Sequence, residues 1–232
     1  YFSTYDLELE AGIFKGLDNL KKLSMRCTYF IGESIPFDFT NEYDRYFTDR
    51  FDSIYNGQDI FTRNIFDGLK KIQQIIIRGF NITTISGYFD DLHTLEILIL
   101  NNNNIHKLTR RVFLGLKKLK VLDLSNNRIW SIGTGVFGAI CNEKFTLTCA
   151  NLTHLSKYCD TSYVLENLEY VNLDKYHLFT IHQQAFLGCN KLKSLHLNGN
   201  AIKTLDFLYL PQLITLELVR SVIFNFSKTV FT

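Results

Sequence analysis

Apolar residues recur every 24 positions through much of the chain. In the most regular stretch, seven residues of one copy reappear in the next as the pairs Leu95/Leu119, Leu98/Leu122, Leu100/Leu124, Asn103/Asn127, Ile105/Ile129, Leu108/Ile132 and Phe113/Phe137. Further copies begin at Ile72, Leu168, Leu192 and Leu213, and weaker ones at Leu20 and Phe145. Self-similarity at this period predicts one repeat solenoid that occupies the whole chain, residues 1–232.

Each copy contains an alternating triplet, such as Leu98-Ile99-Leu100, that predicts a short β-strand. Stacked coils would join these strands into a parallel sheet and bury the Leu and Ile positions in a continuous core. We therefore expect an α/β solenoid with a parallel β-sheet on its concave face and an irregular or short helical convex side.

Two other columns accompany the strands. The amide of an asparagine after the strand can satisfy backbone groups of the turn. That column holds Asn103, Asn127 and Asn200, but also Phe80, Ala150, Tyr176 and Ser221. A phenylalanine column should stack as an aromatic spine under the convex side, and a haem or flavin box is the less favoured alternative. It comprises Phe14, Phe66, Phe89, Phe113, Phe137, Phe186, Phe207 and Phe231.

The columns together read LxxLxLxxNxIxxIxxxxFxxL. Over nearly its whole length the chain resembles extracellular leucine-rich repeats of the 24-residue animal type, which implies a horseshoe-shaped solenoid. The chain begins and stops inside the repeat pattern, with no cysteine-rich cap at either end. Because terminal repeats need polar caps, we expect a fragment of a longer ectodomain, with any membrane anchor outside these residues.

Residues 31–58 form a degenerate, lengthened repeat rich in Phe, Tyr, Asp and Glu. One interpretation is a protruding recognition loop, since loops on rigid scaffolds often carry binding residues. The alternative is a drifted repeat whose rings fill its own core, and the sequence favours it.

Residues 141–167 form a second irregular repeat, which contains three of the five cysteines. We favour a Cys141–Cys159 disulfide that clamps this coil, and an oxidising compartment would follow from it. Other pairings remain open. Cys189 aligns with a core leucine position and is expected to be a buried free thiol.

Three sequons, at Asn81, Asn151 and Asn225, are candidate N-glycosylation sites. Chance alone would produce about as many in a chain of this composition, but all three fall at columns expected to be exposed. Their placement favours secretion.

The net charge of +2 argues against a nucleic-acid footprint. No GxSxG, HExxH, Walker or GxGxxG motif occurs, so we expect no enzyme, no cofactor and no metal site. The histidines are scattered, and His196 is interpreted as a solvated polar residue facing the concave side.

The outward strand positions line up across coils and indicate a recognition surface. One column runs Gln74, Ile97, Val121, Lys144 and Tyr170, and its neighbour runs Ser24, Ile76, Ile99, Asp123, Thr146, Asn172, His196 and Glu217. Exposed apolar patches rimmed by polar groups mark binding sites. The predicted ligand-binding residues are therefore Ile76, Arg78, Ile97, Ile99, Val121, Asp123 and Tyr170. The alternative is that β-propensity fills these strands, or that a loop of the intact protein covers them.

The runs LKKLSMRCTYFIGESIPFDF and NNRIWSIGTGVF resemble the amino-terminal half of invertebrate Toll-type receptors. The resemblance implies a single-pass cell-surface receptor of innate immunity or cell adhesion, with membrane contact only outside this chain. Its partner would be a cystine-knot cytokine or a latrophilin-type adhesion receptor, and a dimer is compatible with it. Rival interpretations are a secreted leucine-rich immune factor, a neuronal adhesion protein and, in another class, an enzyme inhibitor.

Overall fold

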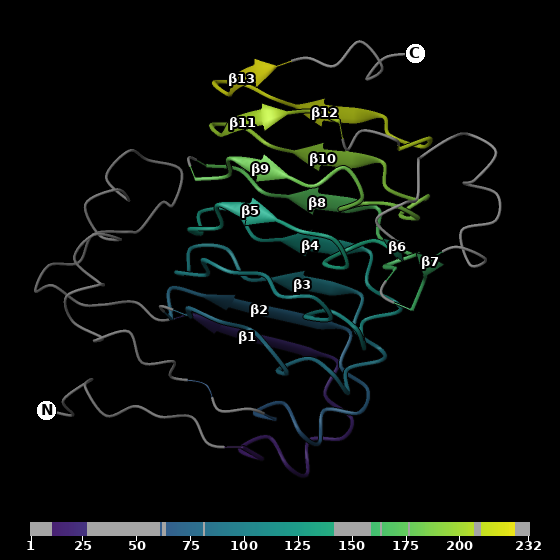
Figure 1. Cartoon of the computed structure of the whole chain (residues 1–232). Helices are drawn as coiled ribbons and strands as arrows, with labels where there is room; N and C mark the ends of the chain where they lie inside the picture. The colour runs from purple at the N-terminus through teal and green to yellow at the C-terminus, as the bar shows by residue number, and fades with distance from the viewer. Residues whose placement is uncertain are drawn as a thin grey trace, which may run out of the picture.

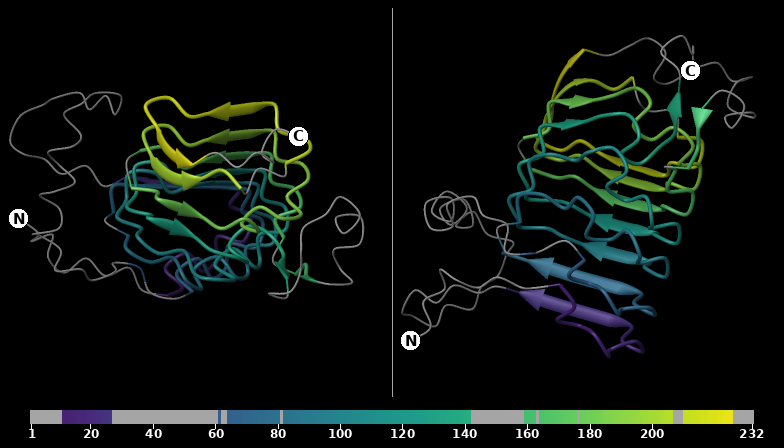
Figure 2. Two further views of the ribbon diagram at one scale, coloured as in Figure 1. Left: turned by 45° about the horizontal axis from the view of Figure 1, so that its top comes forward. Right: turned by 60° about the horizontal axis from the view of Figure 1, so that its bottom comes forward.

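A stack of coils, each contributing one strand to a common sheet, makes up the computed structural model (Figure 1). The structure describes residues 11–26, 61, 64–80, 82–141, 159–162, 164–175, 177–206 and 210–225. Two further views show the same stacking from above and below (Figure 2). The repeat period thus yields the leucine-rich repeat solenoid that the sequence predicts.

The main sheet has seven strands, all parallel, which run along one side of the solenoid. In spatial order they are β1 (Lys22–Arg26), β2 (Gln74–Arg78), β3 (Ile97–Ile99), β4 (Val121–Asp123), β8 (Tyr170–Asn172), β10 (Ser194–His196) and β12 (Thr215–Glu217). The three-residue strands begin one residue before the predicted triplets, as Ile97–Ile99 does for Leu98-Ile99-Leu100, whereas the five-residue strands β1 and β2 contain theirs. Alternation places one side chain of each strand in the core and its neighbours on the sheet surface.

Shorter strands lie elsewhere in the coils. Parallel pairs are β5 (Ser131–Ile132) with β9 (Thr180–Ile181) and β11 (Ala201–Thr204) with β13 (Val222–Asn225), and β6 (Ile140–Cys141) pairs antiparallel with β7 (Cys159–Asp160). Opposite the main sheet, the described residues form turns rather than helices, so the convex side is irregular there. Within the described ranges, no helix is long and apolar enough to cross a membrane.

The core is a continuous apolar column between the sheet and the convex turns. The central strand residues Ile75, Leu98, Leu122, Val171 and Leu195 are all completely buried. Burying apolar surface is the dominant favourable term in folding, so this column supplies most of the stabilisation. The neighbouring strand residues are half-buried and form the sheet's outer surface.

The predicted phenylalanine spine forms two stacks among the described residues, one from Phe14 to Phe89 and one from Phe113 to Phe186. Ring centroids of neighbouring coils stack 5.6 Å apart for Phe66–Phe89, 5.9 Å for Phe113–Phe137 and 5.0 Å for Phe137–Phe186. Phe14 stacks on Phe66 at 6.0 Å. These rings fill the core, which is the interpretation that we favoured from the sequence over a haem or flavin box. Phe207 and Phe231 lie outside the described residues.

The asparagine ladder joins consecutive coils. The side-chain amide of Asn127 donates to the carbonyls of Leu100 and Leu124, and its oxygen accepts from the Ile105 amide. Asn103 and Asn200 are also buried and bond the backbone of their own coil and the preceding one.

Ser221 occupies the ladder position in the last described coil and takes over part of this role. Its hydroxyl donates to the Leu197 carbonyl at 2.7 Å and accepts from the Asn200 amide at 3.2 Å. A hydroxyl can bridge two coils in this way because it both donates and accepts.

The residue before the ladder position adopts a left-handed backbone in six coils. Its φ is positive at Gly79, Asn102, Asn126, Lys175, Gly199 and Arg220. Glycine and asparagine tolerate this region, whereas lysine and arginine pay a steric cost there. The left-handed residue turns the chain out of the sheet, and the next side chain is buried at Phe80, Asn103, Asn127 and Asn200.

Strand β4 pairs directly with β8, which corrects one prediction. The register joins Val121 to Tyr170 and Asp123 to Asn172. Lys144 and Thr146 therefore do not stand between these pairs, although the sequence columns placed them there. The segment 141–167 adds no strand to the main sheet between β4 and β8, and residues 142–158 themselves lie outside the described part.

Strand β1 likewise pairs directly with β2, with Ser24 opposite Ile76. No strand of the main sheet therefore lies between β1 and β2, although the predicted lengthened repeat at 31–58 separates them in the sequence. Those residues lie outside the described ranges, so the choice between recognition loop and drifted repeat stays a prediction.

Candidate functional site

The outer surface of the main sheet brings several predicted site residues together. Ile97 lies opposite Val121 in the strand register, and Ile76 lies opposite Ile99. All four side chains are half-buried and face away from the core. We call Ile76, Ile97, Ile99 and Val121 the concave apolar patch. It spans strands β2, β3 and β4.

Two predicted polar residues border this patch. Tyr170, on β8, lies opposite Val121, and burial raises the pKa of its phenol. Asp123 ends β4 opposite Ile99, and its carboxylate accepts from the amide of Ser125 at 2.9 Å and from its hydroxyl at 2.7 Å. The tyrosine ring thus extends the apolar surface, while the aspartate caps the turn that follows its own strand.

Arg78 lies at the end of β2, beside the patch, and is half-buried with a buried Nε atom. Its Nε has no hydrogen-bond partner among the described residues, and neither does the buried Oδ1 of Asn101 after β3. Buried polar atoms are normally paired. These two atoms are exceptions to that rule at one edge of the sheet.

A polar cluster that the sequence did not predict covers the other half of the sheet. Asp174 follows β8, His196 ends β10 and Glu217 ends β12, and one ligand atom of each lies within 4.8 Å of the others. We call these three residues the acid–histidine cluster. His196 was interpreted as a solvated residue, and that is wrong. Its side chain is only 16% exposed, and its Nδ1 lies 2.9 Å from a Glu217 oxygen.

The hydrogen bonds and the burial of this cluster set its electrostatics. The Asn198 side-chain amide bonds Glu217 Oε2 at 2.7 Å, and this bond lowers the pKa of the glutamate despite some desolvation. Burial raises the pKa of Asp174, although the Asn198 amides partly oppose it. The two carboxylates are thus held close together on one asparagine.

The 24-residue period predicted the position of two of these three residues. His196 and Glu217 were placed in one outward column, and their strands pair in that register. Asp174 was missed because it follows its strand, where the pattern assigns a turn. Asp174 lies diagonally to the His196–Glu217 pair, and a column-by-column comparison does not detect a diagonal neighbour.

The flank of the solenoid carries a second set of exposed apolar residues. Trp130, Phe179 and Phe224 are 59%, 44% and 61% exposed, and the rings of Phe179 and Phe224 lie 5.8 Å apart. All three stand three positions after the ladder position in their coils. None of the three was among the predicted ligand-binding residues, because that prediction rested on the outward strand positions.

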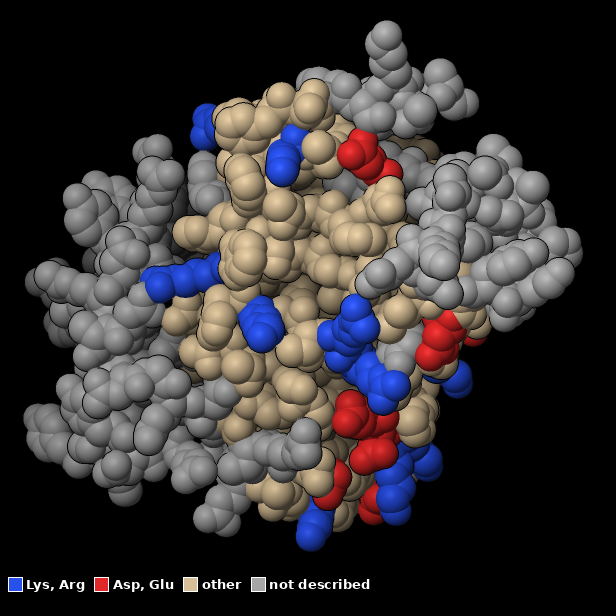
Figure 3. All heavy atoms as spheres, viewed as in Figure 1, with Lys and Arg blue, Asp and Glu red and all other residues tan. Residues whose placement is uncertain are grey.

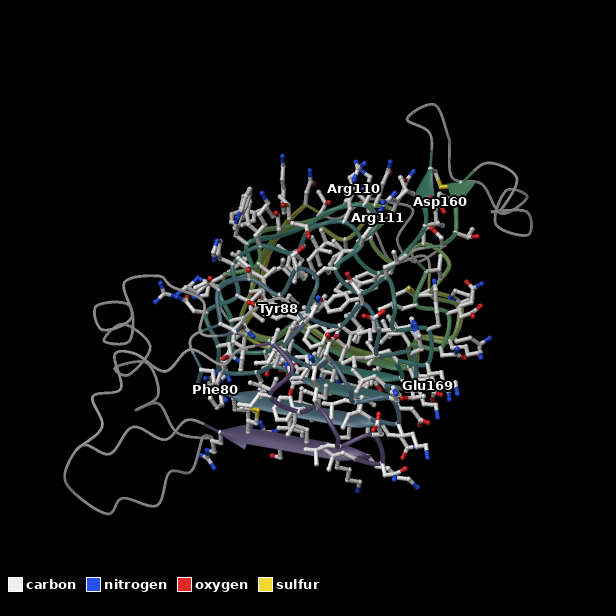
Figure 4. All side chains as sticks on the ribbon, turned by 90° about the horizontal axis from the view of Figure 1, so that it is seen from below. Phe80, Tyr88, Arg110, Arg111, Asp160 and Glu169 are labelled. Atoms are coloured by element: carbon white, nitrogen blue, oxygen red, sulfur yellow. A yellow bond between two sulfur atoms is a disulfide. The ribbon has the colours of Figure 1, made fainter. Side chains whose placement is uncertain are left out.

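The cysteines and sequons occupy distinct places. A disulfide joins Cys141 to Cys159 across the β6–β7 pair and lies near Asp160 (Figure 4), while Cys189 is a free, buried thiol. Asn225 is exposed at the end of β13. Cys27, Cys149, Asn81 and Asn151 lie outside the described residues.

The face opposite the main sheet presents charges of both signs. Figure 3 views this face, and its lysine, arginine, aspartate and glutamate side chains lie intermingled. Arg110 and Arg111 lie on this side, away from the main sheet (Figure 4). Such mixing does not produce the single-signed field that a nucleic-acid backbone requires.

The leucine rich repeat family model matches residues 93–140 and 166–223. The chain is a leucine-rich repeat protein. The unmatched residues between the two ranges coincide with the segment that adds no strand between β4 and β8.

Relatives of this leucine-rich repeat protein include Toll-like receptor 3 of Bos taurus. That receptor is 31% identical over 157 residues, which are 62% of this chain and 15% of the receptor. Podocan of Mus musculus is 32% identical over 127 residues, or 50% of this chain and 19% of podocan. The chain thus spans less than a fifth of the curated relatives it matches.

Solved structures show the same fold. The LRIM1/APL1C complex matches with a TM-score of 0.55 at 21% identity, covering 72% of this chain and 29% of the other. The Toll–Spatzle complex of Drosophila matches with a TM-score of 0.50 at 19% identity, covering 73% of this chain and 25% of the other. The leucine-rich repeat protein resembles a Toll-type ectodomain in architecture.

Proposed function

We propose that this chain is part of the ectodomain of a Toll-like cell-surface receptor and binds an extracellular protein ligand on its concave sheet. The observation that carries the proposal is the concave apolar patch. It lines up Ile76, Ile97, Ile99 and Val121 on three adjacent strands whose backbone is held by parallel pairing.

Physical reasoning favours a protein ligand for this patch. An apolar surface rimmed by polar groups gains free energy when a partner excludes water from it. Because the strands are already ordered, binding there costs little backbone entropy. Tyr170 adds an aromatic ring at the border, the type of residue enriched in interface hot spots.

The polar half of the sheet argues against nucleic acid on this face. Its described strands β4, β8, β10 and β12 place Asp123, Asp174 and Glu217 at or just beyond their ends, and no lysine or arginine among their solvent-facing positions. Carboxylates repel phosphates, whereas nucleic-acid binding depends on basic side chains.

The similarity to Toll-like receptor 3 supports a receptor, and the Toll–Spatzle complex is an example of the same fold in a complex. Localisation at the cell surface, or secretion as the alternative, is supported by the Cys141–Cys159 disulfide, since disulfides persist in oxidising compartments. The same disulfide disfavours an intracellular enzyme inhibitor. A secreted immune or adhesion protein remains the second candidate, because podocan is a relative of similar identity.

The test is a binding screen of the purified chain against a panel of extracellular ectodomains and secreted cytokines, by surface plasmon resonance. For any panel member that binds, Ile99→Glu should weaken binding by more than about 2 kcal/mol, because the introduced charge would be buried without a partner. Lys118→Glu, at an exposed position outside the strands, serves as the control and should bind normally. Equal binding by the two variants would rule out the concave patch.

A further inference from the structure

We propose that Asp174, His196 and Glu217 form a binding site for a divalent transition-metal ion of the zinc class. This inference goes beyond the proposed function and does not rest on it. It also departs from the sequence, which predicted no metal site. The three residues come from successive coils, and the strands that position them pair as β8–β10–β12.

The donor set and its spacing suit such an ion. Zinc takes imidazole nitrogen and carboxylate oxygen ligands at about 2.0–2.2 Å. One ligand atom of each residue already lies within 4.8 Å of the others, and His196 Nδ1 lies 2.9 Å from Glu217 Oε2. Small side-chain rotations on a rigid sheet therefore bring all three donors around one ion. The imidazole favours zinc or cobalt over magnesium, which prefers oxygen ligands.

A hydrogen bond to its second ring nitrogen orients His196, as is typical of metal-binding histidines. Its second ring nitrogen, Nε2, lies 2.8 Å from the Ser194 hydroxyl. That hydroxyl can accept from Nε2–H, which leaves Nδ1 unprotonated and able to bind a metal. Because a hydroxyl also donates, Ser194 accommodates the other tautomer when Nδ1 instead bonds Glu217. The tyrosine ring of Tyr170 packs beside the imidazole, with ring centroids 4.8 Å apart.

The carboxylates are oriented in the same way. The Asn198 side chain donates to Asp174 Oδ2 at 3.2 Å and to Glu217 Oε2 at 2.7 Å, and its backbone amide donates to Asp174 Oδ1 at 2.6 Å. Hydrogen bonds to ligating carboxylates fix their direction and tune the metal site. Asn198 is therefore a positioning residue shared by two of the three ligands.

Charge balance favours a cation at this point. Two carboxylates face one histidine, and no lysine or arginine stands at a solvent-facing position of the described strands β8, β10 and β12. A bound divalent ion would supply the missing positive charge. Since three protein ligands leave at least one coordination position open, a water molecule or a partner's side chain would complete the site on the solvent side.

The test uses the full 232-residue chain without a histidine tag, treated with a chelator and dialysed. Zinc chloride is titrated by isothermal titration calorimetry, and cobalt(II) absorption reports the ligand field. We expect saturable binding of one equivalent and a rise in melting temperature with zinc. His196→Ala and the isosteric Glu217→Gln should each weaken zinc affinity at least about tenfold, and Ser194→Ala by a smaller factor.

The matched control is His106→Ala, which removes an exposed histidine from another face and should leave the affinity unchanged. If His196→Ala does not fold, Glu217→Gln decides, because it keeps the side-chain shape. The proposal is overturned if zinc shows no saturable one-equivalent binding, or if both ligand variants bind zinc as the parent chain does.

Discussion

The amide of Leu165 donates to the carbonyl of Phe137 at 2.9 Å, across 27 intervening residues. In two other coils the equivalent turn is closed by residues only three positions apart. There the Leu116 amide donates to the Phe113 carbonyl at 3.0 Å, and the Cys189 amide donates to the Phe186 carbonyl at 2.9 Å. Residues 138–164 are therefore an insertion into a turn whose closing hydrogen bond is the same as in a regular coil. We call these residues the excursion. The Cys141–Cys159 disulfide lies within this excursion.

Replacing residues 138–164 by Leu-Gly, the two residues between Phe113 and Leu116, should restore a regular coil. Because the main sheet and core pass directly from β4 to β8, we expect the shortened chain to unfold cooperatively. Its stability should fall by no more than about 3 kcal/mol, the worth of one large buried side chain such as Leu187, which packs under the excursion. Loss of cooperative urea unfolding would show that the excursion belongs to the folding unit.

Asn127→Ala should lower the free energy of unfolding by about 1–3 kcal/mol, because it leaves buried turn groups of two coils unpaired. Urea denaturation followed by circular dichroism measures the change. Asn190→Ala, at an exposed position, is the control and should stay within about 0.5 kcal/mol of the parent chain. A neutral Asn127→Ala would contradict the ladder as a source of stability.

Gly115→Ala should destabilise the chain by more than about 2 kcal/mol, because a β-carbon there would lie 2.0 Å from the Asp90 carbonyl oxygen of the preceding coil. Backbone atoms cannot rotate away as a side chain can. Gly133→Ala is the matched control, since a β-carbon at Gly133 meets nothing within 4 Å. Melting temperatures of the two variants should therefore differ clearly, and equal values would refute the close approach of these coils.

Cys189 should make stability fall in alkaline solution. Burial raises the pKa of its thiol from 9.0 to about 12, so the folded chain keeps the proton that the unfolded chain loses. The stabilisation is complete below pH 9 and declines as the pH rises toward 12. Between pH 8 and pH 10, the midpoint of urea unfolding should fall further for the parent chain than for Cys189→Ala. The other titrating groups are the same in both chains. Equal drops would contradict this prediction.

Asn225 should carry a glycan when the chain is secreted from animal cells. It is exposed in β13 and begins the sequon Asn225-Phe226-Ser227. Mass spectrometry of glycosidase-treated peptides measures occupancy, and Ser227→Ala should abolish it. Finding Asn81, Asn151 and Asn225 all unoccupied would count against an extracellular protein.

The sequence by itself determined the repeat, the strands and the direction of most side chains. Inward residues such as Leu122 and the ladder residue Asn127 were assigned correctly, because a 24-residue period places equivalent residues in equivalent surroundings. The concave apolar patch follows from the same argument, since strand alternation decides which side chains face outward. Its role in binding stays a prediction.

Only the tertiary structure decided where the 24-residue period fails to predict the pairing of strands. Phe145 matches a repeat position, yet β4 pairs directly with β8, because hydrogen bonding between coils depends on which backbone segments meet in space. The acid–histidine cluster was decided in the same way. His196 and Glu217 lie opposite one another, as their shared column predicts, but Asp174 approaches them from the turn after β8, and a linear pattern does not specify that approach.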